Sequence, residues 1–300
     1  MTERVDIGIA CSAHQSPNWW APIFSNLFRE QQRGTWELGQ IFAVQSAMPD
    51  FNKNNTVGGV LSGTKGRDDK TDVNRNRISG YFLEGGESGA KADWIFWIDD
   101  DTVFPDGAIS HFLRMDKDFV AGLYFNTNPP YNPIAYKRLD NGGYLHLWDY
   151  APGSVFQVDA VGMGCTLIHR SVYERILAEH EVYLRPNGSM FPIHRSLLYK
   201  NDVVEFPEDY PKGYVVGNHL VQEVTKLDPE SKQLQLFPFY QMEHGRTEDM
   251  HFCELAYSVG VRPWVDTSIV CEHWKHACKT FEDYRKEVVR QEIDSKVEAE

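Results

Sequence analysis

The sequence lacks an apolar run of the roughly 18 residues that a membrane-spanning helix needs, and its cysteines are few. The amino terminus, MTERVDIGIACS, carries charges where a signal peptide needs an apolar stretch, so we expect a cytoplasmic protein without a membrane partner. The 5 cysteines are odd in number and never spaced as CxxC. This pattern argues against both a disulfide framework and a thiolate zinc site.

Positive charge is also scarce, because 30 lysines and arginines face 43 aspartates and glutamates, for a formal net charge of −13. Such a balance disfavours a protein that covers nucleic-acid phosphates with its surface. Residues 63–77 (GTKGRDDKTDVNRNR) gather five basic residues against three aspartates. This local patch leaves DNA open as a partner, although it suits a single anionic small molecule better.

Apolar residues are plentiful enough, at 42%, for one large domain or two small ones. Strand-like and helix-like segments alternate along the chain. Strands are expected at 5–13, 38–47, 93–100, 118–125 and 262–274, helices at 18–32, 73–89, 106–114 and 247–260, and a strand, glycine turn and helix within 156–177. This order predicts an α/β fold with a mostly parallel sheet flanked by helices, and ligand sites beyond the carboxyl ends of the strands.

Two segments do not follow this alternation. Residues 126–154, rich in Asn, Pro, Gly and Tyr, predict a hairpin and loops laid over the sheet, and residues 181–244 predict a lid or an acceptor-facing insertion. We therefore expect one domain over 1–275, followed by a charged C-terminal helix over 276–300.

Three consecutive aspartates end the apolar stretch WIFWIDDDTVFP, residues 94–105. So much negative charge at the end of a buried strand costs stability unless a cation lies there. Asp99 and Asp101 are two residues apart and can share one divalent cation, and their hard oxygen atoms suit Mg²⁺ or Mn²⁺. An Asx-rich turn that caps the helix near residue 107 is the structural alternative.

Other candidates lie near the end of the sequence. His273 ends a predicted strand and can act as a third metal ligand through a neutral imidazole nitrogen, and His276 is a weaker candidate. Glu248 and Asp249 open a predicted helix, where carboxylates stabilise the helix dipole. A carboxylate in that position can also accept a proton from a hydroxyl nucleophile.

A strand followed by Asp-x-Asp-x-Thr/Val is also the signature of haloacid dehalogenase-type phosphatases, in which Asp99 would become phosphorylated and Val103 would take the last position. That family opens the chain with this strand and later supplies a Gly-Asp-x-x-x-Asp motif. Here the strand comes after about a hundred residues, and no such partner follows. The phosphatase is kept as an alternative.

The ordered combination of DWIFWIDDD, GRTEDMHFCELAYSVG and DTSIVCEHW resembles the GT-A fold glycosyltransferases of the family 2 type, including phage-encoded members, over residues 5–275. The resemblance implies a Rossmann-like sheet and a nucleotide-sugar donor, a UDP-sugar, held through Mn²⁺ or Mg²⁺. It implies metal ligands at Asp99, Asp101 and His273, with Asp100 near the ribose or the sugar.

The same resemblance assigns catalysis to Glu248 and Asp249, with Asp249 as the base, and places Arg75 and Asn76 near the donor nucleotide or phosphate. It places Ala10 and Ser12 at the uracil side of the pocket. The chain lacks the Gln-x-x-Arg-Trp motif of processive family 2 polymerases, so transfer of one sugar is expected.

The sequence thus predicts a metal-dependent glycosyltransferase that inverts the anomeric centre. A hydroxymethylated DNA base and a glycan are both open as acceptors. A non-catalytic nucleotide-sugar binding protein is a further alternative, which the Glu248 and Asp249 pair disfavours.

Overall fold

The computed structural model describes residues 2–11, 20–45, 71–86, 89–127, 129–184, 190–195, 213–216, 219–222, 225–226, 237–242, 246–274 and 278–279. Residues 63–70 of the basic patch lie outside the described residues, as does much of 181–244. Of the expected C-terminal helix only residues 278–279 are described, and they form a short strand.

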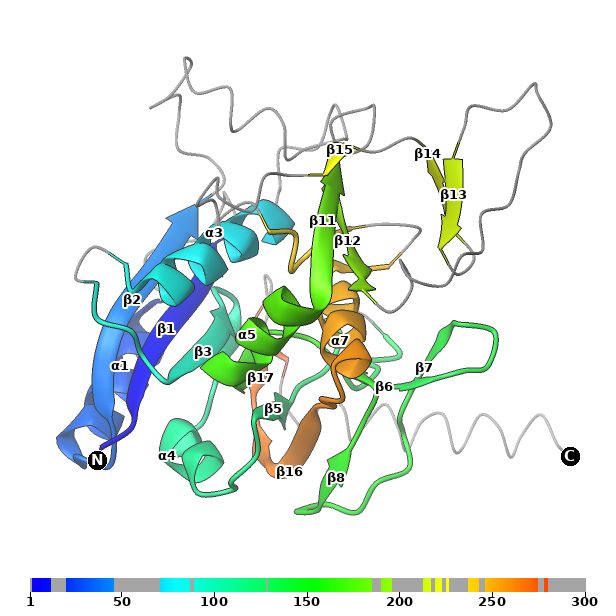
Figure 1. Cartoon of the computed structure of the whole chain (residues 1–300). Helices are drawn as coiled ribbons and strands as arrows, with labels where there is room; N and C mark the ends of the chain where they lie inside the picture. The colour runs from blue at the N-terminus through cyan, green and yellow to red at the C-terminus, as the bar shows by residue number, and fades with distance from the viewer. Residues whose placement is uncertain are drawn as a thin grey trace, which may run out of the picture.

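A seven-stranded sheet with the order β2-β1-β3-β10-β5-β16-β8 forms the centre of the molecule (Figure 1). Its strands are β1 (Arg4–Cys11), β2 (Glu37–Gln45), β3 (Trp94–Asp99), β5 (Phe119–Leu123), β8 (Val155–Gln157), β10 (Cys165–His169) and β16 (Trp264–Val270). All of them run in one direction except β10 and β8, which run in the opposite one. The predicted α/β fold with a mostly parallel, Rossmann-like sheet is confirmed.

One strand departs from the parallel pattern inside the sheet, because β10 lies between β3 and β5 and is antiparallel to both. No described helix separates β5 from β10 in the chain. The chain enters β10 directly after β9 and the glycine turn at 161–165, and β10 then runs back along β3 from the edge where β3 ends. This return brings the glycine-containing turn before β10 to the carboxyl end of β3.

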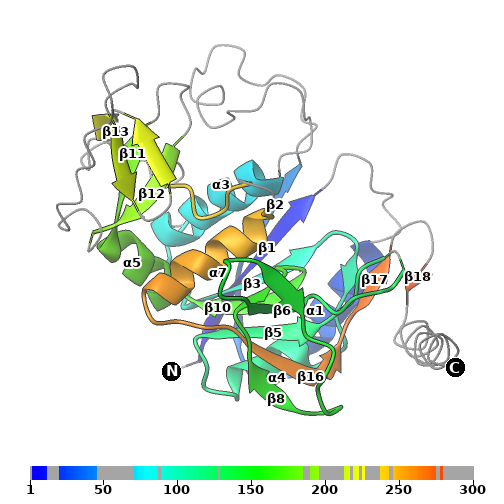
Figure 2. The ribbon, with the colours of Figure 1, turned by 90° about the vertical axis from the view of Figure 1, so that its right-hand side faces the viewer.

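Helices cover both faces of the sheet (Figure 2). The helices α1 (Trp20–Gln32) and α4 (Ala108–Leu113) pack on one face, and α3 (Thr71–Glu84), α5 (Arg170–Glu179) and α7 (Glu248–Ser258) pack on the other. The side chains of β3 alternate between these layers: Ile95 and Trp97 belong to one core and Phe96 and Ile98 to the other. This burial on both faces explains why WIFWI is apolar throughout.

Two predicted helix ends are found where glycines stand. After α3 the chain continues through Gly85 and Gly86, with φ of 87° and 57°, and α7 is followed by Gly260 with φ of 80°. Only glycine adopts such angles without steric cost, so it ends a helix where the backbone turns away.

Smaller sheets lie around the large one. One contains β6 (Ala135–Arg138), β7 (Tyr144–His146) and β9 (Ala160–Val161), and a second contains β4 (Thr102–Val103), β17 (Glu272–Trp274) and β18 (Cys278–Lys279). A third contains β11 (His180–Leu184), β12 (Met190–His194) and β15 (Thr225–Lys226), and a fourth pairs β13 (Gly213–Val216) with β14 (His219–Gln222). The hairpin expected in 126–154 is β6 and β7. The strand expected over 262–274 divides at Cys271 into β16 and β17, which belong to different sheets.

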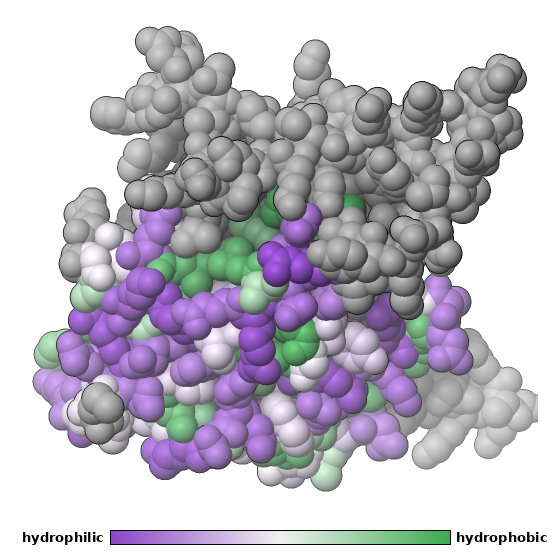
Figure 3. All heavy atoms as spheres, viewed as in Figure 1, coloured by the Kyte–Doolittle hydropathy of each residue, from purple (hydrophilic) through white to green (hydrophobic). Residues whose placement is uncertain are grey.

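Among the described residues, no helix combines the length and apolar character needed to cross a membrane. On the face shown in Figure 3, the described surface is mainly hydrophilic, with hydrophobic residues in small groups between polar ones.

Candidate active site

The candidate site lies at the edge of the large sheet where β1 and β3 end. The backbone register pairs Ala10 of β1 with Asp99 of β3. Beyond Asp99 the chain turns and forms β4, which pairs with β17 so that Thr102 lies opposite His273. This pairing carries a histidine from the far end of the described chain to the aspartates.

Asp101 and His273 are in direct contact. His273 Nε2 lies 3.3 Å from Asp101 Oδ2, and the two side chains are 18% and 21% exposed respectively. On the other side of the ring, Nδ1 donates to the carbonyl oxygen of Phe125 over 2.8 Å. That bond fixes the ring orientation and directs Nε2 towards Asp101, the arrangement that metal-binding histidines use.

Asp99 lies against the glycine turn at 161–165 (VGMGC). The Asp99 backbone N–H points at the carbonyl oxygen of Gly164, 3.4 Å away. A Cβ atom at position 164 would come within 3.0 Å of Asp99 Oδ2 and of the Tyr124 ring. The backbone of this turn therefore packs closely against Asp99 and Tyr124, which only glycine allows at position 164.

The start of α7 supplies two more carboxylates. Glu248 and Asp249 occupy its first turn, and their side chains are 8% and 18% exposed. Arg75 Nε lies 3.6 Å from Glu248 Oε1 and 3.5 Å from Asp249 Oδ1. Arg75 Nη2 donates to Asp99 Oδ1 over 2.7 Å. One arginine of α3 therefore joins the end of β3 to the start of α7.

The buried charges shift one another's pKa values. The pKa of Asp249 is raised to about 8: burial is the main cause, Arg75 opposes it, and the charges of Glu248 and Asp99 add to it. Burial likewise raises the pKa of Glu248 and of Asp99 against the effect of Arg75. Burial lowers the pKa of Arg75, but the three carboxylates outweigh it and hold that pKa well above its usual range.

The pKa of His273 is raised as well. Burial lowers it, but the hydrogen bond and the negative charge of Asp101 more than compensate. The site therefore holds carboxyl and imidazole groups that can exchange protons near neutral pH, which acid–base chemistry requires.

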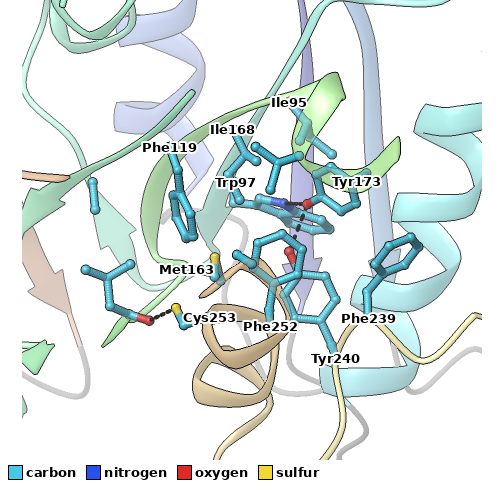
Figure 4. Close-up of a cluster of buried hydrophobic side chains, with 14 of the residues drawn as sticks. Ile95, Trp97, Phe119, Met163, Ile168, Tyr173, Phe239, Tyr240, Phe252 and Cys253 are labelled. Atoms are coloured by element: carbon cyan, nitrogen blue, oxygen red, sulfur yellow. Dashed lines mark hydrogen bonds between the residues drawn. The ribbon is translucent and has the colours of Figure 1, made fainter. Parts of the chain in front are cut away.

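Aromatic side chains lie close together in the core (Figure 4), and two of them contact Arg75. The guanidinium carbon of Arg75 lies 5.5 Å from the ring of Trp97 and 5.8 Å from that of Tyr240. Trp97 Nε1 donates to the Tyr173 hydroxyl over 2.8 Å, and the Tyr173 and Tyr240 hydroxyls are 2.9 Å apart. Tyr240 stacks on Phe252 of α7 with ring centroids 4.9 Å apart. The site is thus built directly on the core.

The structure brings most of the predicted site residues together. At the sheet edge Ala10 pairs with Asp99 and Asp101 contacts His273, and Arg75 connects Asp99 to the predicted catalytic pair, Glu248 and Asp249.

The remaining predicted site residues differ in placement. Asp100 is buried, with 5% exposure. The side chain of Asn76 bonds to the backbone of Tyr240 through both its oxygen and its nitrogen, so it is occupied within the fold. Ser12 and His276 lie outside the described residues.

Three residues at the site were not predicted individually. Gly164 is signalled by the VGMGC turn, but a glycine turn alone does not say what it approaches. Tyr124 accepts a hydrogen bond from the Gly164 N–H over 3.1 Å, and Tyr240 covers Arg75. A tyrosine in an apolar run and a tyrosine in an irregular segment carry no sequence signal for these contacts.

The three predicted metal ligands are not gathered around one point. Within the described part of the chain, no three His, Cys, Asp or Glu side chains are close enough to hold a metal together. Asp101 and His273 are adjacent, whereas one oxygen of Asp99 is bonded to Arg75. Carboxylate oxygen and imidazole nitrogen are ligands that Mn²⁺ accepts, so the residues fit a divalent cation in chemical type.

Comparison with known proteins finds no matching family model and no matching curated protein. Among solved structures, the chain is similar to A197 from STIV (12% identity, 91% of this chain and 86% of that chain, TM-score 0.40). It is also similar to a glycosyltransferase involved in the glycosylation of the major capsid of PBCV-1 (9%, 57% and 62%, 0.28) and to GalNAc-T7, solved with UDP, GalNAc and Mn²⁺ (8%, 96% and 47%, 0.37).

Proposed function

We propose that the protein is a metal-dependent glycosyltransferase that moves one sugar from a nucleotide sugar, a UDP-sugar, to an acceptor hydroxyl. The observation that supports this most directly is the meeting of two acidic groups at one edge of the sheet. Asp99 ends β3 and Asp101 follows it beside His273, Glu248 and Asp249 start α7, and Arg75 lies between the two groups. One group suits a cation that holds a diphosphate, and the other suits a base.

In the proposed reaction, the acceptor oxygen forms a bond to the anomeric carbon while the bond from that carbon to the diphosphate oxygen breaks. The diphosphate leaves with the electron pair, and the acceptor proton passes to a carboxylate oxygen of Asp249. A bound Mn²⁺ or Mg²⁺ would offset the negative charge of the leaving diphosphate. Attack opposite the leaving group inverts the anomeric configuration.

The phosphatase alternative requires Asp99 to attack phosphorus. Asp99 Oδ1 accepts a hydrogen bond from the guanidinium of Arg75, whose side chain is 2% exposed. A carboxylate oxygen bonded in this way is a weak nucleophile. This contact favours a role for Asp99 in binding rather than in covalent catalysis.

The first experiment measures thermal unfolding with UDP, GDP, CDP and ADP, each with and without Mn²⁺. A nucleotide at a hundred times its Kd adds about 2.7 kcal/mol of stability, or roughly 5 °C for a chain of this size. We expect this shift for UDP only with Mn²⁺, and we expect it to be lost in Asp101→Ala. Asp118→Asn is the matched control. Asp118 precedes β5, at the edge of the large sheet opposite to the candidate site, and its side chain is 50% exposed.

Absence of any nucleotide response in the wild type would refute the proposed donor site and leave the phosphatase to be tested with a generic phosphoester. A response to UDP without turnover of any UDP-sugar would indicate the non-catalytic binding protein instead. Once an acceptor is found, NMR assignment of the anomeric product tests the role of Asp249, since a product that keeps the donor configuration contradicts it. A DNA acceptor would make activity fall steeply with salt concentration.

A further inference from the structure

Arg75 differs from the acidic residues of the site in its exposure. The Arg75 side chain is 2% exposed, whereas those of Asp99, Asp101 and Asp249 are 23%, 21% and 18% exposed. A ligand that enters from solvent therefore meets the carboxylates first. The arginine lies beneath them, between the acidic groups and the aromatic core.

The contacts of Arg75 are divided between two elements. Its Nη2 bonds to Asp99 at the end of β3, while its Nε faces both Glu248 and Asp249 at the start of α7. A guanidinium can do this because its nitrogens form a rigid planar fork, which a single ammonium group does not offer. Removal of the charge would leave three carboxylates close together without a counter-charge.

The position of Arg75 is itself fixed by the core. Trp97 and Tyr240 flank the guanidinium, and the neighbouring residue on α3, Asn76, holds the Tyr240 backbone through two hydrogen bonds of 2.7 and 2.8 Å. The arginine therefore cannot swing out towards solvent without breaking this packing.

The bond from Arg75 also changes what Asp99 can offer to a ligand. One carboxylate oxygen, Oδ1, is taken by the arginine at 2.7 Å. The other, Oδ2, lies beside Gly164, where an added Cβ atom would come within 3.0 Å of it. Asp99 can thus give a cation one oxygen and not two.

We propose that Arg75 is a positioning residue rather than a phosphate ligand. It holds Asp99 to a single free oxygen, so that a divalent cation is held mainly by Asp101 and His273, and it keeps Asp249 in place at the start of α7. This inference rests on the proposed function for the identity of the ligands, but not for the contacts themselves.

The first readout is Mn²⁺ binding without nucleotide, measured by calorimetric titration on the full chain. The variants are Arg75→Met, Arg75→Lys and the control Arg29→Met, which changes an exposed arginine on α1. We expect Arg75→Met to bind Mn²⁺ about tenfold more tightly than the wild type, because Asp99 regains its second oxygen and a nearby positive charge is gone. The control should match the wild type.

The second readout separates positioning from phosphate binding. If Arg75 is a positioning residue, Arg75→Met binds UDP at saturating Mn²⁺ with a Kd within about threefold of the wild type. Its rate of UDP release from a UDP-sugar falls by about 100-fold or more, because Asp249 is displaced. For a phosphate ligand, UDP binding weakens by about tenfold or more and the affinity for Mn²⁺ alone is unchanged. The latter result overturns the inference.

Circular dichroism establishes first that each variant is folded. If Arg75→Met does not fold, Arg75→Lys carries the test: its point charge cannot reach both Asp99 and the α7 carboxylates, and we expect about threefold tighter Mn²⁺ binding with reduced turnover. Wild-type Mn²⁺ affinity in every folded Arg75 variant, or no Mn²⁺ binding by the wild type, overturns the inference. The expected Mn²⁺ results without any nucleotide binding would support it while refuting the proposed function.

Discussion

Asn76 offers a sharp test of whether a predicted site residue binds ligand or supports the fold. Its side chain donates to the carbonyl oxygen of Tyr240 over 2.7 Å and accepts from the Tyr240 N–H over 2.8 Å, and the residue is 6% exposed. Asn76→Ala leaves both backbone groups buried without these partners. At about 1–3 kcal/mol for each unsatisfied group, the expected loss of unfolding free energy is about 4 kcal/mol.

The assay is thermal unfolding with and without UDP and Mn²⁺. A loss of about 4 kcal/mol corresponds to a drop in Tm of roughly 8 °C for a chain of this length. Asn74→Ala is the matched control, because Asn74 is buried on the same helix, yet its Nδ2 has no hydrogen-bond partner within the described part of the chain. Its truncation should cost clearly less. An unchanged Tm for Asn76→Ala, together with loss of the UDP response, would refute the structural role and restore donor binding.

Three further predictions concern packing and pH. Gly162→Ala places a Cβ atom against the Tyr124 hydroxyl and should cost about 1–3 kcal/mol in urea unfolding. Gly143→Ala should be near neutral, because its Cβ meets only the exposed side chains of Asn141 and Leu139. Burial lowers the pKa of His180 to about 4. Folding therefore disfavours protonation of His180, so the stability that the neutral side chain contributes is complete above about pH 6.5 and is lost as the pH falls. Between pH 7 and 5 the free energy of unfolding should decrease by about 2 kcal/mol from this residue, and His180→Gln should remove this pH dependence. If the proposed base Asp249, with its pKa of about 8, must be ionised, kcat/KM should rise about tenfold between pH 7 and 9, and a flat profile would contradict that role.

The strands and helices of the domain could be predicted because burial leaves a mark on local sequence. The run WIFWI is apolar at every position since both faces of β3 are covered, and α7 ends near a glycine because the backbone takes a positive φ there. The direction of β10 could not be predicted in this way. Its sequence is that of any buried strand and does not indicate in which direction the strand runs.

The candidate site was predictable to the extent that its residues end or begin elements. Asp99 ends β3, Asp249 lies in the first turn of α7, and His273 follows β16. Ligand sites of α/β sheets lie beyond the carboxyl ends of the strands, so these residues could be assigned to one site. Arg75 was predicted to lie near the donor nucleotide or phosphate, and the structure places its side chain at 2% exposure in contact with three carboxylates. The spacing of α3 cannot reveal this, because the contacts that bury Arg75 come from residues at least 22 positions away, Trp97 and Tyr240 among them.

Arg75 therefore offsets part of the negative charge at the end of β3. Arg75 supplies one positive charge for Asp99, Glu248 and Asp249, which leaves the group acidic even before Asp101 is counted. Because burial penalises this excess charge, the cluster gains more from a cation than exposed aspartates would. The same burial ties the cluster to Trp97 and Tyr240, so a substitution in the aromatic core that leaves the chain folded should still alter cation binding at the surface.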